Sequence, residues 1–227
     1  MTSKKTTITK QEAARSQLET AIKLYFENRD LISAYTLCSA ANGILEGIYE
    51  NEREIIIAKQ LDRHSEPTEI QYSWNEEWEM RFKPEYLIES FRLLNATQNF
   101  LKHADKDHDS IHEYDDWEET GARIFMAVRN YHIVFEKVTS AMNVFFSVYV
   151  SLRPNLLQKE SSLHKQILSN RPFDDIIQRI SQSELAAIGY GCLEKSCPEL
   201  FPPTDLTSNL QPTYTTGATF QMPMSKD

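Results

Sequence analysis

One short run indicates the fold, because it ends a segment in which apolar residues recur regularly: Gln98-Asn99-Phe100-Leu101-Lys102-His103-Ala104-Asp105. Before and within this run, apolar residues recur at alternating spacings of four and three, with one amide among them: Leu87, Phe91, Leu94, Gln98 and Leu101. This is the spacing of the buried face of an α-helix. At about 100° per residue, Arg92, Asn99 and His103 share the flank beside that face. The run therefore predicts a helix over residues 85–103 whose polar edge suits a pocket or an interface.

The helical period recurs along most of the chain, which contains only six glycines. It predicts helices over residues 9–28, 31–52 or beyond, 85–103, 117–138, 141–152, 174–180 and 182–194. Thr9 and Glu12 have the spacing of a capping box, Asp30 can cap the second helix, and Ser181 or Ser183 can cap the last. We expect the most apolar helix, residues 141–152, to be the central one. The sequence predicts an all-α fold, an antiparallel helical bundle with additional C-terminal helices.

The composition changes along the chain and indicates three regions. Residues 1–8 form a flexible N-terminus, residues 9–202 a helical domain, and residues 203–227 a tail rich in proline and threonine. A tail of this composition is expected to be extended along the surface or disordered. Residues 64–82 lack a clean period, so they are expected to form a long loop whose aromatic residues cover the core.

Charge and cysteine content limit the class of protein. The formal net charge is −9 and the isoelectric point is near 5.2, which weighs against DNA as a partner because phosphate binding needs clustered lysine and arginine. Cys38, Cys192 and Cys197 provide neither an even disulfide framework nor a four-ligand zinc site. The longest apolar stretch, around residues 144–150, is too short to cross a bilayer. We expect a soluble, cytoplasmic protein with reduced thiols, no membrane partner and no cofactor.

The spacing Asn99-x-x-x-His103 resembles the signature of the HEPN superfamily, an arginine followed by Asn, Asp or His, three residues and a histidine. The opening helices, residues 14–41, are similar to those of a group of uncharacterised bacterial proteins, and the resemblance covers about residues 10–150. It implies a small helical bundle of bacterial or phage origin that forms a homodimer. Many members are metal-independent ribonucleases whose two subunits share one cleft. In an active member, His103 would be the general acid or base and Asn99 would orient it or the phosphate, with Arg92, Gln98 and Lys102 as binding residues.

One position departs from that signature, because Gln98 stands where the superfamily has arginine. A neutral amide supplies no fixed positive charge to a phosphate in the transition state, a loss of several kcal/mol or roughly a hundredfold in rate. Arg92 lies eleven residues before His103, about 16 Å along a helix, and is a poor substitute. We therefore expect an inactive module that binds RNA, a nucleotide or a protein partner, with weak ribonuclease activity left open. The alternative is a noncatalytic dimeric scaffold in which His103 only caps the helix C-terminus.

The acidic run after this helix has part of the ligand spacing of a calcium-binding loop. Carboxylates at positions 1, 3 and 5 of an EF-hand would be Asp105, Asp107 and Asp109. The match then fails, because Ser110 replaces the glycine of the sharp turn and Asp116 replaces the bidentate glutamate. Histidines in the same region are an alternative set of ligands for a transition metal: His103, His108 and His112. We expect no metal, and a solvated acidic connector between two helices.

Overall fold

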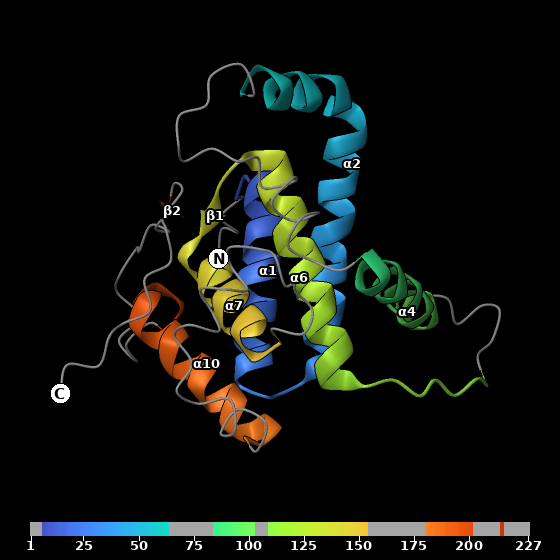
Figure 1. The fold of residues 1–227 in the computed structure, drawn as a ribbon, viewed down its shortest axis with the longest axis vertical. Helices are drawn as coiled ribbons and strands as arrows, with labels where there is room; N and C mark the ends of the chain where they lie inside the picture. Colours follow the sequence, from blue (N-terminus) through green and yellow to red (C-terminus); the bar gives the residue numbers. More distant parts are fainter. Residues whose placement is uncertain (1–5, 64–83, 103–108, 154–179, 202–213, 216–227) are drawn as a thin grey trace, which may run out of the picture.

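The structure is a computed structural model, and it describes residues 6–63, 84–102, 109–153, 180–201 and 214–215 (Figure 1). Six α-helices lie in this described part: α1 (Lys10–Phe26), α2 (Leu31–Arg63), α4 (Pro84–Lys102), α6 (Asp116–Phe135), α7 (Ser140–Leu152) and α10 (Gln182–Ser196). A short 3-10 helix, η2 (Pro198–Leu200), follows α10. Two-residue strands β1 (Val138–Thr139) and β2 (Tyr214–Thr215) pair antiparallel. The predicted all-α helical bundle is confirmed.

The sequence signals for the helix starts are borne out by the local hydrogen bonds. The hydroxyl of Thr9 accepts from the backbone N–H of Glu12, and the Glu12 carboxylate accepts from the N–H of Thr9, which completes a capping box. The Asp30 carboxylate accepts from a backbone N–H in the first turn of α2. Ser181, rather than Ser183, caps α10 and forms a second capping box with Glu184. These bonds satisfy amides that have no partner inside the helix.

The central helix is α6, so the prediction that residues 141–152 would be central is wrong. The run Gly121–Val128 is buried at eight consecutive positions, and α6 packs against α1, α2, α4 and α7 (Figure 1). In α7 several apolar residues, among them Val144 and Val148, are only half-buried. Arg123 and the charged residues near the two ends of α6 lower its mean hydropathy, although its middle part, Gly121–Val128, is buried on every side. Hydropathy therefore ranked the two helices in the wrong order.

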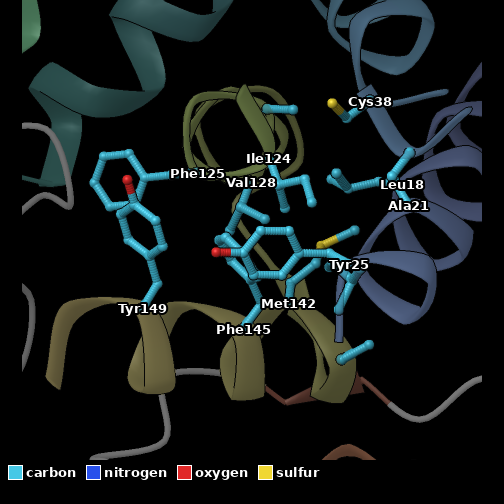
Figure 2. Close-up of a cluster of buried hydrophobic side chains, with 14 of the residues drawn as sticks. Leu18, Ala21, Tyr25, Cys38, Ile124, Phe125, Val128, Met142, Phe145 and Tyr149 are labelled. Atoms are coloured by element: carbon cyan, nitrogen blue, oxygen red, sulfur yellow. The ribbon is translucent and has the colours of Figure 1, made fainter. Parts of the chain in front are cut away.

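Aromatic side chains fill the core between α1, α6 and α7. The ring of Tyr25 stacks on Trp117 at a centroid distance of 3.9 Å and meets Phe145 edge-on at 5.6 Å. Phe145 and Tyr149 stack at 5.3 Å along α7. Figure 2 shows Tyr25, Phe145 and Ile124 converging between the three helices. Because aromatic pairs combine large buried areas with preferred ring geometries, this layer fixes how the helices pack.

Two glycines let helices approach more closely than any side chain would allow. A Cβ atom built on Gly189 of α10 would lie 2.2 Å from the ring of Phe26 on α1. One built on Gly121 of α6 would lie 2.7 Å from the hydroxyl of Tyr25 and 2.8 Å from the ring of Tyr149. Gly189 therefore sets the spacing of α10 from α1, and Gly121 sets the spacing of α6 from both α1 and α7.

Other boundaries differ from the predicted ones or lie outside the described residues. The second helix continues to Arg63, whereas α6 ends at Phe135 because Glu136 adopts a left-handed conformation with φ of 57°. The predicted loop over residues 64–82 and the predicted helix over 174–180 fall outside the described residues. So does most of the predicted tail, of which the structure describes Tyr214 and Thr215, paired with β1.

Candidate functional site

The helix α4 carries most of the candidate residues identified from the sequence, and their side chains face two different sides. Leu94 and Thr97 are buried, and Gln98 and Leu101 are half-buried against the bundle. On the outer side, solvent-exposed side chains include Arg92, Asn99 and Lys102. The structure therefore separates Gln98 from the other predicted binding residues. The predicted catalytic residue His103 lies just beyond the described end of α4.

Gln98 is held by a buried arginine from α6. The Nη2 of Arg123 donates to the Gln98 Oε1 at 2.5 Å, and its Nε donates to the Ser39 Oγ of α2 at 3.0 Å. The Arg123 side chain is only 4% exposed. Both partners are neutral, and none of the carboxylates in the described part of the chain forms an ion pair with it. A buried guanidinium of this kind depends strongly on its hydrogen bonds, because they replace the water that it has lost.

A second polar group ties α4 to the segment that precedes α6. The Thr97 hydroxyl donates to the Glu119 Oε2 at 2.5 Å and lies 2.7 Å from the Nε2 of His112. Because the Thr97 hydroxyl donates its proton to Glu119, it accepts a proton in its hydrogen bond with His112. The Nε2 of His112 therefore carries a hydrogen. The His112 ring also stacks on Phe100 at 5.1 Å and on Tyr114 at 5.9 Å.

A hydroxyl, an imidazole and a carboxylate in one chain of hydrogen bonds have the composition of a nucleophilic triad. Here the order is different, because the Thr97 hydroxyl lies between His112 and Glu119 and donates to the carboxylate. An activated nucleophile instead gives its proton to the imidazole. Thr97 is also 1% exposed, so a substrate has no access to it. The arrangement fastens α4 to α6 and performs no nucleophilic chemistry.

A third bond attaches the middle of α4 to α2. The hydroxyl of Tyr35, which is fully buried, donates to the backbone carbonyl of Leu94 at 2.6 Å. Burial raises the pKa of the Tyr35 hydroxyl well above its usual value, and it raises the pKa of the neighbouring Cys38 thiol to about 12. Cys38 is therefore a protonated, inert core residue rather than a nucleophile. Cys192 and Cys197 are free thiols as well.

Most of the candidate metal ligands lie outside the described residues. Asp109 is exposed, while Asp105, Asp107 and His108 lie outside the described residues. Among the residues that are described, no group of three or more potential ligands is close enough to hold a metal ion. His112, the described histidine of the alternative set, is engaged with Thr97.

The sequence did not indicate a groove of about 360 Å³ between α2 and α6. At its edge, the amide of Asn130 donates to Asn42 at 2.7 Å, and Asn42 donates to Glu46 at 2.6 Å. Apolar, acidic and basic side chains line it together: Leu45, Tyr49, Glu50, Arg129, Ile133 and Val134. Because these charges are mixed, the groove selects no single class of ligand.

Sequence reasoning also missed Arg123 and Glu119, and it named His112 only as a candidate metal ligand. A signal for Arg123 exists, since it is the one charged residue within the apolar run Gly121–Val128. A charge at such a position implies a buried polar partner. No comparable signal marks the structural role of His112, because its partners Thr97 and Phe100 lie on α4.

Comparisons with known proteins returned no match, whether to protein-family models, to curated proteins or to solved structures. Within the described residues, no helix has the length and apolar character needed to cross a membrane.

Proposed function

We propose that this chain is a degenerate HEPN-like module that binds a partner and does not cleave RNA. The observation that carries the proposal is the bond between Gln98 and Arg123. In the superfamily signature, the residue at the position of Gln98 is an arginine that can meet the phosphate. Here the side chain is turned into the bundle, and its oxygen is used by a buried guanidinium. The residue that would stabilise charge in a transition state is thus replaced by one with a structural task.

The partner that we propose is a second copy of the chain, which meets the outer side of α4. Figure 1 places α4 beside α2 and α6, with its far side uncovered by the other described helices. The exposed side chains of α4 include Leu93, which is 42% exposed, and Asn99. Exposed apolar residues on one face of a helix favour association between subunits. The dimer implied by the HEPN resemblance supports the same arrangement.

The catalytic part of this proposal is tested with purified protein, a mixed RNA pool and a chelator. We expect wild type and His103→Ala to release fragments at the same background rate. Cleavage by wild type that is lost in His103→Ala would overturn the proposal.

The dimer is tested by sedimentation at micromolar concentrations. We expect wild type to be a dimer and Leu93→Asp to be a monomer. Ile188→Asp is a matched control, because Ile188 is 48% exposed on α10, away from α4. A monomeric wild type, or a Leu93→Asp variant that remains dimeric, would contradict the proposed interface.

A metal-independent ribonuclease is the second candidate, favoured by the common exposure of Arg92, Asn99 and Lys102 on α4. The exchange Gln98→Arg with Arg123→Gln tests whether the motif arginine is the one missing part, because it keeps a guanidinium and an amide facing each other. Cleavage that appears in the exchanged protein, resists chelator and needs His103 would favour a latent nuclease site. No cleavage would favour the binding module.

A further inference from the structure

The segment between the acidic run and α6 has the alternation of a β-strand although it belongs to no sheet. Ile111, Glu113 and Asp115 are exposed, whereas His112 and Tyr114 between them are half-buried. Residues 111–115 contain no helix or turn, and Asp115 has extended backbone angles. Alternate side chains of an extended chain point to opposite faces. One face of residues 111–115 is therefore turned to the protein and the other to solvent.

The inner face holds the segment in a fixed register. His112 is bonded to Thr97 and stacked between the rings of Phe100 and Tyr114. At the end of the segment, the Asp115 carboxylate accepts from the N–H of Glu118 at 2.9 Å and caps α6. A segment anchored in this way presents its outer face with little entropy left to lose on binding.

The backbone of the segment is open to a partner. Within the described part of the chain, the peptide groups of residues 110–114 form no hydrogen bond with other backbone groups. An extended backbone with free N–H and C=O groups is a template for an added strand.

The outer face also has a distinct chemistry. Ile111 is 92% exposed, the largest exposed fraction among the large apolar side chains of the described residues. Glu113 lies two residues after it on the same face, so an acid stands beside an exposed isoleucine. In a strand pair, residues on the same face contact each other directly. The complementary strand would carry an apolar side chain and, two positions away, a basic one.

We infer that residues 110–114 are a docking edge for an extended peptide of a partner protein. This peptide adds as a strand, places an apolar residue on Ile111, and sets lysine or arginine against Glu113. The inference goes beyond the proposed function, because it uses a surface other than the outer side of α4 and a partner other than a second copy.

The experiment pans a library of random twelve-residue peptides on the full-length protein and measures the selected peptides by fluorescence anisotropy. We expect enriched sequences in which a basic residue stands two positions from Val, Ile or Leu. Ile111→Thr and Glu113→Lys should each weaken their binding by at least about tenfold. Ile188→Thr, which removes an exposed isoleucine from α10, should leave the affinity unchanged. Hydrogen exchange at residues 110–114 should slow when the peptide is bound.

Four results would overturn the inference. The first is a library that yields no enriched peptide, and the second is a selected peptide that binds Ile111→Thr and Glu113→Lys as tightly as wild type. The third is unchanged hydrogen exchange at residues 110–114. If Ile111→Lys converts a wild-type dimer into monomers, the occupant is a second copy and the peptide inference is wrong. Leu93→Asp tests the α4 dimer separately, so the two proposals can fail independently.

Discussion

The central helix α6 is attached to its neighbours in two different ways. Toward α1 and α7 its contacts are aromatic and aliphatic, with Ile124 and Val128 packed against Tyr25 and Phe145 (Figure 2). Toward α4 the prominent contacts are polar, and the two side chains that α6 contributes are Arg123 and Glu119. The contacts of α6 with α1 and α7 form an apolar core, whereas its contacts with α4 are directional hydrogen bonds.

These two kinds of contact contribute differently to the fold. Burial of apolar area is nondirectional and supplies most of the stability, whereas a buried hydrogen bond contributes about 1 kcal/mol net and requires a specific geometry. The apolar contacts of α6 with α1 and α7 therefore contribute more to stability, and its hydrogen bonds with α4 fix the orientation of α4. We expect α4 to open more readily than the core, as elements with few apolar contacts do.

The largest expected effect comes from the core. Phe145→Ala should lower the free energy of unfolding by about 3–5 kcal/mol, because it removes a fully buried ring and leaves a cavity. Urea denaturation followed by circular dichroism measures the loss. Ile188→Ala, at a 48% exposed position, is the control and should change stability by less than about 0.5 kcal/mol. Similar losses of unfolding free energy in the two variants would show that buried Phe145 contributes no more to stability than exposed Ile188.

The next effect tests the polar side. Gln98→Arg should lower the free energy of unfolding by about 3 kcal/mol, because it places a second guanidinium against buried Arg123. Gln98→Glu should be at least as stable as wild type at neutral pH, since it offers that cation a carboxylate. Urea titrations of both variants, with and without Arg123→Gln, measure the coupling. A Gln98→Arg variant as stable as wild type would show that the two side chains do not interact.

Local signals in the sequence predicted most of the described helices. The caps at Thr9, Asp30 and Ser181 depend on residues within one turn of each other, so sequence spacing alone identifies them. The inward stripe of α4 follows from the helical period in the same way, and the structure buries Leu94 accordingly.

The candidate site could not be predicted to the same extent, because its contacts join distant residues. Gln98 and Arg123 are 25 residues apart, and Thr97 and Glu119 are 22 apart. The helical period places Gln98 on the inner face but does not say which residue faces it. The central position of α6 was missed because its charged and polar residues lower its hydropathy, although the apolar run Gly121–Val128 marks a buried part.

A smaller effect is expected where α2 meets α4. Tyr35→Phe removes the hydroxyl that donates to the Leu94 carbonyl and should cost about 1 kcal/mol. Hydrogen exchange measured by mass spectrometry should become faster in α4 while α7 stays protected. Tyr190→Phe is a control for the loss of a hydroxyl, because Tyr190 lies on α10. Equal acceleration in α4 and α7 would mean that α4 does not open separately.

The smallest effect concerns an acid on the core side. Burial raises the pKa of the Glu19 carboxyl above its ordinary value of 4.5, and the bond to Thr139 and the charge of Arg15 only partly offset it. A carboxyl with a raised pKa in the folded state contributes stability below pH 4.5 and loses it as the pH rises through the folded value. Glu19→Gln should therefore match wild type in acid and exceed it in stability at pH 7. Urea midpoints measured from pH 4 to 8 test this. If the difference in stability between the two proteins stays constant over that range, the Glu19 carboxyl is solvated. Water would then reach this part of α1.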